Sequence, residues 1–296
     1  MKKELLLVIN PHSGKGRIRN KLLDVVDMFV KEGWSVAVHT TQSAGDGFEI
    51  VKACGSCFQR IVASGGDGTL NEVIRGIMTI PEEQRPTIGY LPSGTVNDFA
   101  SNMHIPKNSI KAAQNVLSGM PFKCDIGRFN QKNFVYVAAF GAFTNVSYET
   151  PQQNKNALGQ MAYFLEGIKQ LHMLPSFKMD ITIDGEEISG EFILGMISNS
   201  NRIAGFKTVK AYKAQLNDGL FEVLLVKKPN TLAELSDLGA KLLKQDLTTD
   251  AVRIFRTSNA VFKSETEVQW TLDGEFGGTV KCADISVEKE AVSIII

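Results

Sequence analysis

The chain lacks two features that would each indicate a different class of protein. Lysine plus arginine and aspartate plus glutamate number 32 each among its 296 residues, so there is no basic excess. A nucleic-acid-binding protein of this size normally carries such an excess, and we therefore expect no nucleic-acid partner. The longest apolar runs are only as long as a β-strand, which argues against a membrane-spanning helix. The chain therefore has the properties of an ordinary globular protein, and its length suits one large domain or two smaller ones.

Cysteine is also scarce, with four residues in the chain. Cys54 and Cys57 have the C-x-x-C spacing of a redox pair, but they end a helical pattern instead of preceding one. A redox pair lies at the start of a helix, where the helix dipole lowers the pKa of the first thiol. Cys124 and Cys282 are isolated, and the four histidines show no metal-ligand spacing. The sequence therefore predicts neither a redox site nor a zinc site.

The first ten residues resemble a signal peptide only superficially. Two lysines precede the apolar run at 5–9, but Asn10-Pro11 follows it in place of a small-residue cleavage site. The apolar run is also too short for the core of a signal peptide. We therefore expect a cytoplasmic protein.

The first part of the chain alternates apolar strands with amphipathic helices. Strands are expected at 5–9, 35–41, 60–63 and 87–91, and a second helix is expected to open at 44–46. The helix after the first strand is expected to bury one face, made of Leu22, Leu23, Val25, Val26, Phe29 and Val30. Continuous apolar strands joined by such helices predict an α/β fold with a doubly wound parallel sheet.

The pattern changes after about residue 124, where strand-like segments follow one another. They lie at 134–140, 177–183, 192–197, 220–226, 252–262 and 268–272, with helical stretches at about 157–173 and 231–247. The run at 177–183 alternates apolar and polar residues and leads into Asp184-Gly185, which indicates a hairpin. We expect a nucleotide-binding α/β domain at 1–124, to which the last strand at about 284–296 is a candidate to return. A β-rich, antiparallel, sandwich-like domain with helices is expected at 125–283.

One segment, Ser64 to Val73, combines a glycine turn with a carboxylate. It follows an apolar strand and leads into a helical pattern, so backbone N–H groups and the positive end of the helix dipole face one point. This arrangement favours a phosphate. Asp67 in the middle of the turn would repel a phosphate directly, so we expect a metal ion or another polar group between them.

Two more strand-to-loop junctions, at 10–16 and 92–98, are rich in glycine and polar residues. In a parallel sheet such loops lie along the carboxyl edge of the strands, where open α/β folds bind ligands. The first loop matches neither a Walker A loop nor a dinucleotide fingerprint, because it lacks their glycine spacing. Each loop alone is weak evidence, but three on successive crossovers predict a phosphate-binding site.

The three loops taken in order resemble the catalytic fold of the diacylglycerol kinases. The motifs are Asn-Pro-x-Ser-Gly-Lys at 10–15, Gly-Gly-Asp-Gly-Thr at 65–69 and Pro-Ser-Gly-Thr-x-Asn-Asp at 92–98. The resemblance covers essentially the whole chain and is closest to the soluble bacterial lipid kinases. Sphingosine and ceramide kinases share this fold, and NAD kinases are similar more distantly. The resemblance implies a kinase that uses ATP and Mg²⁺ to phosphorylate diacylglycerol to phosphatidic acid.

The resemblance also implies roles for residues of the first domain. Asp67 and Asp98 would position magnesium and the nucleotide, which agrees with the cation expected beside the loop aspartate. The implied ATP-binding residues are Asn10, Thr41, Gly66, Asp67, Gly68, Thr69, Leu70, Asn71, Glu72 and Thr95.

In the second domain, the resemblance implies a catalytic role for the segment Asp273-Gly274-Glu275. Glu275 would be the general base for the attacking hydroxyl, and Asp273 would assist the metal arrangement. Asp184-Gly185-Glu186 repeats the same three letters, but no glycine pair follows it. We interpret this second copy as an exposed hairpin turn.

The resemblance assigns a structural magnesium to the segment 215–220. Its ligands would be the Asp218 carboxylate and the backbone carbonyls of Gln215 and Leu220. By spacing alone, the same segment is typical of a β-turn before a strand. Relatives often carry a glycine triplet near 204–206 and a proline at the position of Tyr212, so this chain departs from the family close to the segment.

Three alternative functions share these loops. The same reaction could act on another lipid alcohol, such as a sphingoid base or phosphatidylglycerol, because no short motif encodes the acceptor. An NAD kinase is disfavoured by the segment 91–100. A nucleotide-binding regulator without catalysis is disfavoured by the presence of Asp67, Asp98, Asp273 and Glu275.

A membrane lipid as substrate implies peripheral contact with a membrane surface during catalysis. One candidate contact is a basic strip made of Lys15, Arg17, Arg19 and Lys21, although such a strip is more often the solvated face of a helix. The sequence does not set the oligomeric state, but strand edges in a β-rich domain would allow a homodimer.

Overall fold

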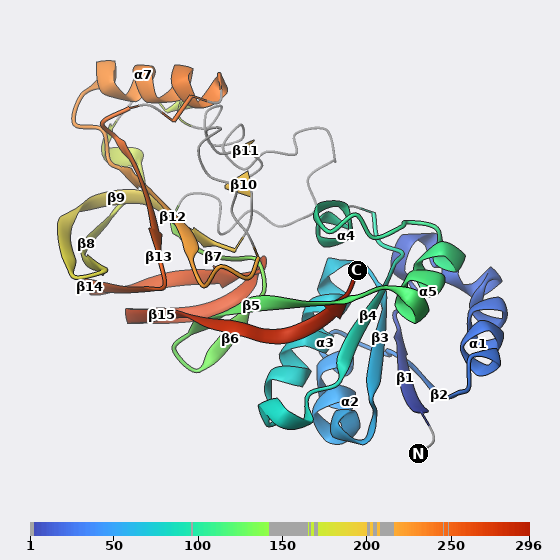
Figure 1. The fold of residues 1–296 in the computed structure, drawn as a ribbon. Helices are drawn as coiled ribbons and strands as arrows, with labels where there is room; N and C mark the ends of the chain where they lie inside the picture. The colour runs from blue at the N-terminus through green and yellow to red at the C-terminus, as the bar shows by residue number, and fades with distance from the viewer. Residues whose placement is uncertain are drawn as a thin grey trace. The chain divides into compact units, whose positions relative to one another are not determined.

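The computed structural model describes most of the chain and divides it into two compact units. The described residues are 3–95, 97–141, 171–199, 216–244 and 249–296, with short pieces at 165, 167–168, 202–203, 206–207 and 246–247. The first unit comprises residues 1–125 and 290–296, and the second comprises residues 126–289 (Figure 1). Strands β5 (Pro121–Phe129) and β15 (Glu275–Ile295) contribute residues to both units.

The first unit is built on a parallel sheet in the order β4-β3-β1-β2. The end of β15 adds to this sheet beside β4, where Ile294 pairs with Ile88 in parallel. Strands β1, β3 and β4 are nearly continuous apolar runs, as expected for strands covered on both faces. The strands before β15 are β1 (Lys3–Ile9), β2 (Trp34–Thr40), β3 (Arg60–Gly65) and β4 (Thr87–Pro92).

Helices lie on both faces of this sheet, so the predicted doubly wound α/β fold is confirmed. Figure 1 shows α1 and α5 on one face and α2 and α3 on the other. Strand side chains alternate between the faces, and Leu5 and Leu7 belong to one core cluster with Phe29 of α1 and Val116 of α5. The helices are α1 (Leu22–Lys31), α2 (Asp46–Cys54), α3 (Asp67–Met78), α4 (Asp98–Asn102) and α5 (Ser109–Ser118), with 3-10 helices η1 (Ser13–Asn20), η2 (Gly55–Cys57) and η3 (Glu82–Gln84).

The apolar face of α1 is narrower than the sequence predicts. Val25 and Phe29 are fully buried, whereas Leu23 is 79% exposed and Val30 is 53% exposed. Positions 22, 25, 26 and 29 follow the helical spacing of one face, and positions 23 and 30 lie one step around the helix from it. The prediction that Leu23 and Val30 are buried was therefore wrong.

The second unit is an antiparallel β structure, as predicted. Its main path runs β13-β12-β9-β7-β14-β15, and β8 pairs with both β9 and β14. Because β7 also pairs with both β9 and β14, the sheet folds back on itself around its core. The elements are β6 (Lys132–Phe134), β7 (Val137–Gly141), η4 (Leu171–Met173), β8 (Phe177–Ile183), β9 (Glu186–Ser198), β10 (Arg202–Ile203), β11 (Phe206–Lys207), β12 (Phe221–Lys227), α7 (Leu232–Leu243), β13 (Val252–Thr257) and β14 (Asn259–Leu272).

Aromatic side chains fill the core of the second unit. Trp270 is 1% exposed and its ring lies 4.9 Å from Phe140 and 5.3 Å from Phe262, measured between centroids. Tilted and edge-on contacts of this kind add to the stabilisation from apolar burial. The alternation of apolar residues along β8 and β14 points one set of side chains into this core. In β9, residues 192–197 are buried on both faces and supply this core and a second one.

Three predicted elements of the second unit differ from the observed ones. The strand expected at 134–140 is interrupted at 135–136, and the one expected at 252–262 is interrupted at Ser258. At Ser258 the Thr257 hydroxyl accepts the N–H of Asn259 over 3.0 Å, which closes a local turn. The helix expected at 231–247 spans 232–243, with Thr231 as its N-cap. The helical stretch expected at 157–173 lies largely outside the described residues.

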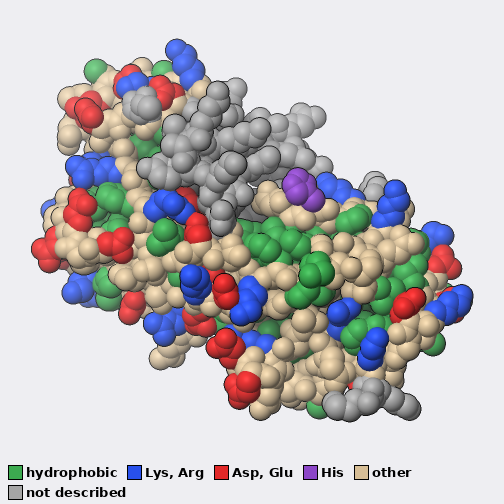
Figure 2. Space-filling view, in the orientation of Figure 1, with side chains coloured by type: hydrophobic (Ala, Val, Ile, Leu, Met, Phe, Trp, Pro, Cys, Tyr) green, Lys and Arg blue, Asp and Glu red, His purple; other side chains and the backbone are tan. Residues whose placement is uncertain are grey.

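The surface is mixed in charge, in keeping with the zero net charge. Figure 2 shows Lys and Arg side chains interspersed with Asp and Glu over the face that it draws. Among the described residues, no helix is both long and apolar enough to cross a membrane.

The observed face of α1 leads to a stability prediction. We expect Phe29→Ala to lower the free energy of unfolding by about 3–5 kcal/mol, because it leaves a cavity in a closed core. Leu23→Ala on the exposed side is the matched control and should change it by less than about 0.5 kcal/mol. Urea denaturation of both variants measures the difference, and equal losses would contradict the assignment of the buried face.

Candidate functional site

The three glycine-containing loops of the first unit meet at the carboxyl ends of β1, β3 and β4. Asn10 donates its backbone N–H to the Ser64 carbonyl over 2.9 Å, which joins the first loop to the second. Ser93 donates to the Gly65 carbonyl over 2.8 Å, which joins the third loop to the second. The loops therefore lie side by side at the sheet edge where open α/β folds bind ligands.

Glycines permit this close approach of the three loops. A Cβ atom on Gly14 would lie 1.6 Å from the carbonyl oxygen of Ser93, and one on Gly94 would lie 2.5 Å from the Cα of Gly66. Gly14 also has a φ of +56°, in the region that side chains disfavour. Any larger residue at these two positions would push the loops apart, so the glycines serve the packing of the site as well as ligand access.

The second loop presents the start of α3. Its N-cap is Gly66, which has no side chain with which to cap the helix, so the N–H groups of the first turn are available to an anion. Asp67 is the first helical residue, and its Oδ1 accepts the Phe99 N–H over 3.3 Å. The structure thus places the expected carboxylate directly at a helix end that favours a phosphate.

The expected ATP-binding residues after Asp67 differ in exposure. Gly68 is exposed, whereas Thr69 is 6%, Asn71 is 9% and Leu70 is 0% exposed. The Leu70 side chain packs in the core, and its backbone N–H donates to the Gly66 carbonyl over 3.2 Å. A ligand at this helix start would therefore meet Gly66, Asp67 and Gly68 before the buried residues that follow them.

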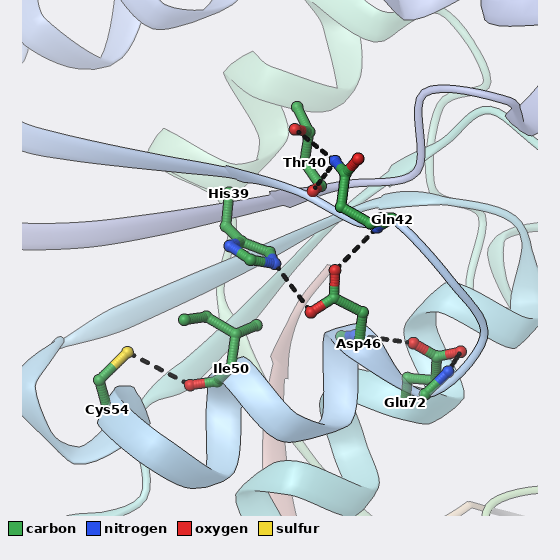
Figure 3. Close-up of polar contacts among 9 residues, drawn as sticks. His39, Thr40, Gln42, Asp46, Ile50, Cys54 and Glu72 are labelled. Atoms are coloured by element: carbon green, nitrogen blue, oxygen red, sulfur yellow. Dashed lines mark hydrogen bonds and ion pairs between the residues drawn. The ribbon is translucent and has the colours of Figure 1, made fainter.

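Glu72 binds the start of the neighbouring helix α2. Its Oε1 accepts the Gly45 N–H over 2.8 Å, and its Oε2 accepts the Gly47 N–H over 2.9 Å (Figure 3). A Cβ atom on Gly47 would lie 2.7 Å from Glu72 Oε2, so a larger residue there would displace the carboxylate. A carboxylate on the N–H groups of a helix start is a favourable charge-assisted arrangement. The resemblance implies an ATP contact for Glu72, and the structure shows what its carboxylate holds.

Asp46 holds the same segment from the other side. Its Oδ2 accepts the Gln42 N–H over 2.7 Å, and its Oδ1 lies 3.2 Å from Nε2 of His39 (Figure 3). The backbone bond from Gln42 is the main cause that lowers the pKa of Asp46, and His39 lowers it further. Thr41, an expected ATP contact, opens this segment; it is 8% exposed and donates its N–H to the Ile9 carbonyl over 2.8 Å. The carboxylates of Asp46 and Glu72 therefore hold the backbone of the segment that follows Thr41.

Cys54 is the last residue of α2, and Cys57 ends the 3-10 helix η2 that follows it. Cys54 donates its thiol to the Ile50 carbonyl over 3.2 Å (Figure 3). Burial, and then the neighbouring Cys57, raise the pKa of the Cys54 thiol, which is the opposite of what a reactive cysteine needs.

Asn97 and Tyr90 shape the third loop. Asn97 has a φ of +55°, its Oδ1 accepts the Gly94 N–H over 2.9 Å, and its Nδ2 donates to the Gly94 carbonyl over 2.8 Å. The hydroxyl of buried Tyr90 donates to Asn97 Oδ1 over 3.3 Å. Burial, and then the Asp67 carboxylate, raise the pKa of Tyr90, so this hydroxyl stays protonated and remains a donor. Sequence reasoning gave neither residue a role, although Asn97 belongs to the third motif.

The other expected residues of the third loop are partly described. Thr95 is exposed, as an ATP contact would require. Asp98 begins α4, and its side chain lies outside the described residues.

In the second unit, Asp273 and Gly274 form the two-residue turn between β14 and β15. Their φ values of +51° and +88° are those of a tight hairpin turn. Asp273 Oδ2 accepts the N–H of Val135 over 2.7 Å, and Oδ1 accepts those of Tyr136 over 2.7 Å and Val137 over 2.9 Å. These bonds explain the interruption between β6 and β7, because the amides there bind a carboxylate instead of a strand.

Glu275 follows this turn and is exposed at the start of β15. The second copy of the motif, at 184–186, forms the exposed hairpin turn that the sequence predicts, with φ values of +48° and +84° at Asp184 and Gly185. The Asp184 carboxylate accepts the Thr257 hydroxyl over 2.7 Å, the one side-chain bond that the described residues give it. The two turns share a backbone geometry and differ in what the aspartate binds.

The expected structural-metal segment is described from residue 216 onward, so Gln215 lies outside the described residues. Asp218 Oδ1 accepts the Leu220 N–H over 3.0 Å, and Oδ2 lies 2.5 Å from Nη2 of Arg256. Sequence reasoning missed Arg256, because its only signal is a position opposite Glu222 that depends on strand register.

Comparison with known proteins agrees with the motifs. Residues 4–129 match the diacylglycerol kinase catalytic domain, and residues 137–296 match the YegS C-terminal NAD kinase beta sandwich-like domain. A diacylglycerol kinase of Bacillus subtilis (strain 168) is 37% identical over 279 residues, which cover 93% of this chain and 91% of that protein. The chain belongs to the diacylglycerol kinase family. As a member of this family, it is a diacylglycerol kinase-like phosphotransferase, as the ordered motifs predict.

Further relatives extend this agreement. A diacylglycerol kinase of Staphylococcus aureus (strain MRSA252) is 34% identical over 291 residues, which cover 98% of this chain and 91% of that protein. The crystal structure of a diacylglycerol kinase from Bacillus anthracis str. Sterne has a TM-score of 0.72 at 22% identity and covers 99% of this chain and 96% of that one. This structural likeness shows the shared two-part fold.

The position of Glu72 leads to a prediction about α2. Glu72→Gln keeps one oxygen acceptor and loses the charge, so we expect faster hydrogen exchange at the Gly45 and Gly47 amides and a loss of about 1–2 kcal/mol in stability. Glu49→Gln, at an exposed position in the first turn of α2, is the control and should change neither the exchange rates nor the stability. Unaltered exchange at the two amides of Glu72→Gln would contradict the bond assignment.

Proposed function

We propose that this enzyme transfers the γ-phosphoryl group of ATP to the free hydroxyl of diacylglycerol and produces phosphatidic acid. The observation that carries the proposal is the meeting of three glycine-containing loops at one sheet edge, with Asp67 at the uncapped start of α3. The names of the curated relatives support diacylglycerol as the acceptor. A different lipid alcohol, such as a sphingoid base or phosphatidylglycerol, is the alternative acceptor for the same reaction.

In this proposal, the first unit binds the nucleotide. The backbone N–H groups at Gly66 and Gly68 would bind phosphate oxygens, because the helix start offers donors and a positive dipole end. Asn10, Thr41 and Thr95 would make further contacts with ATP. Glu72 would act by keeping the chain after Thr41 in place through Gly45 and Gly47.

The residues around Asp67 fit a magnesium ion bound together with ATP. A carboxylate beside a phosphate-binding helix start is unfavourable unless a cation lies between the two anions. Mg²⁺ is commonly held by one or two carboxylates together with substrate phosphates and water, and Asp67 and Asp98 would be those carboxylates. When bound, the ion would neutralise charge on the phosphate oxygens.

We assign the proton acceptor to Glu275 in the second unit. As the hydroxyl oxygen of the lipid forms its bond to the γ-phosphorus, the bond to the β-phosphate oxygen breaks and ADP leaves. The hydroxyl proton would pass to the Glu275 carboxylate, which is exposed at the start of β15. Asp273 would position Glu275, because its three amide bonds hold the hairpin turn that Glu275 follows.

A lipid acceptor is supported by the side chain next to Glu275. Phe276, the next residue of β15, is 65% exposed, so one large apolar side chain is exposed next to the proposed base in the sequence. Such a neighbour suits an acyl chain better than a polar dinucleotide, which favours a lipid kinase over an NAD kinase. The enzyme would then contact the membrane peripherally. In the proposed basic strip, Lys21 forms an ion pair with Asp24 at 3.1 Å, which reduces the charge it offers to anionic lipid.

The reaction can be tested by phosphate transfer from labelled ATP to a panel of lipid alcohols in mixed micelles. We expect Mg²⁺-dependent labelling of diacylglycerol, identified as phosphatidic acid by mass. Labelling of a sphingoid base or phosphatidylglycerol instead would replace the acceptor and keep the reaction. Binding of ATP without labelling of any lipid would overturn the proposal.

The assignment of the base can be tested with two carboxylates in matching turns. Glu275→Gln should lower kcat by roughly 10²–10⁴-fold, as expected for loss of a general base, with little change in the KM for ATP. Glu186→Gln follows the other Asp-Gly turn and should retain full activity. If Glu186→Gln loses activity and Glu275→Gln keeps it, the assignment is wrong.

A further inference from the structure

Three charged side chains of the second unit meet where β12 begins. Asp218 precedes β12, Glu222 is its second residue, and Arg256 lies on the neighbouring strand β13. Antiparallel pairing puts Glu222 directly opposite Arg256. The position of Arg256 is therefore set by the register of the two strands.

The Arg256 guanidinium lies between the two carboxylates. Its Nη2 is 2.5 Å from Asp218 Oδ2, and its Nε is 3.4 Å from Glu222 Oε1. The side chains of Asp218 and Arg256 are 20% and 27% exposed, and that of Glu222 is 2% exposed. Burying a carboxylate as deeply as Glu222 is costly without an opposite charge nearby, and Arg256 lies within ion-pair distance of it.

The same carboxylate of Asp218 also shapes the turn before β12. Its Oδ1 accepts the Leu220 N–H over 3.0 Å, and Gly219 between them has a φ of +78°. A Cβ atom on Gly219 would lie 3.3 Å from the Lys289 side chain, so a further basic residue passes beside the turn. One oxygen of Asp218 thus closes the turn and the other ties it to β13.

This arrangement fits poorly with the structural magnesium that the family resemblance implies at Asp218. A divalent cation on Oδ2 would have to share that oxygen with a guanidinium already at 2.5 Å. Two cations so close together repel each other strongly at a partly buried site.

We propose that the Arg256 guanidinium takes the place of the structural magnesium and is the cation that holds the turn at 216–220 onto β13. The planar guanidinium donates to Asp218 and lies within ion-pair distance of Glu222, so it connects the turn, β12 and β13. The inference concerns the second unit alone and holds whichever lipid is the acceptor. It does not concern the magnesium ion proposed to bind together with ATP in the first unit.

Hydrogen exchange of the full-length protein without nucleotide tests this proposal at the turn itself. In the wild-type protein, exchange in the segment 216–227 should be the same in EDTA and in millimolar Mg²⁺. Arg256→Gln should speed exchange at Leu220 and the first residues of β12 by roughly tenfold or more, because the turn loses its tie to β13. Arg253→Gln, an exposed arginine on the same strand, is the matched control and should have no effect.

Two outcomes would overturn the proposal. The first is slower exchange of the wild-type segment in Mg²⁺ that Asp218→Asn abolishes, which would mean that a metal ion binds there despite Arg256. The second is unchanged exchange in Arg256→Gln. If Arg256→Gln does not fold, the comparison of the wild-type protein in EDTA and Mg²⁺ still decides between guanidinium and metal.

Discussion

The structure depends on carboxylates that accept backbone N–H groups from segments distant in sequence. Glu72 takes two amides at the start of α2, and Asp273 takes three between β6 and β7. Such charge-assisted bonds satisfy backbone donors that no helix or strand supplies with a partner. Each bond set fixes a loop that carries a proposed ligand contact or the proposed base. Glu72 and Asp273 therefore have a structural role in addition to any role in catalysis.

This constraint explains how the candidate site is built from three glycine-containing loops. The glycines at 14 and 94 remove side chains so that three loops can touch, and Asn97 and Tyr90 then fix the third loop. Asp67 is left at the start of α3, beside donors that favour a phosphate. In the second unit, Asp218 ties a turn to Arg256 in the way that Asp273 ties a turn to backbone amides.

Much of the fold was predictable because its signals are local. Continuous apolar runs predicted the parallel strands, and Asp184-Gly185 predicted a hairpin turn. The strand expected at 268–272 placed the motif at 273–274 directly after a strand. The failures have two different causes. The predicted buried face of α1 wrongly included Leu23 and Val30, which lie one step around the helix from it. The strand expected at 134–140 is interrupted because amides there bind a carboxylate more than a hundred residues away in the sequence. Among the site residues, the ordered motifs identified the family, but the partners of Glu72 and Asp218 were not visible in them.

The sequence by itself determined most of the strands and turns and the order of the three loop motifs, because backbone preference and periodic burial act over a few residues. Only the tertiary structure decided what each acidic side chain holds. The turns at 184–185 and 273–274 have the same letters and the same backbone, yet one aspartate accepts a hydroxyl and the other accepts three amides. The reason is physical: the reach of a carboxylate is set by which distant segment packs against it, and strand register and loop approach decide that.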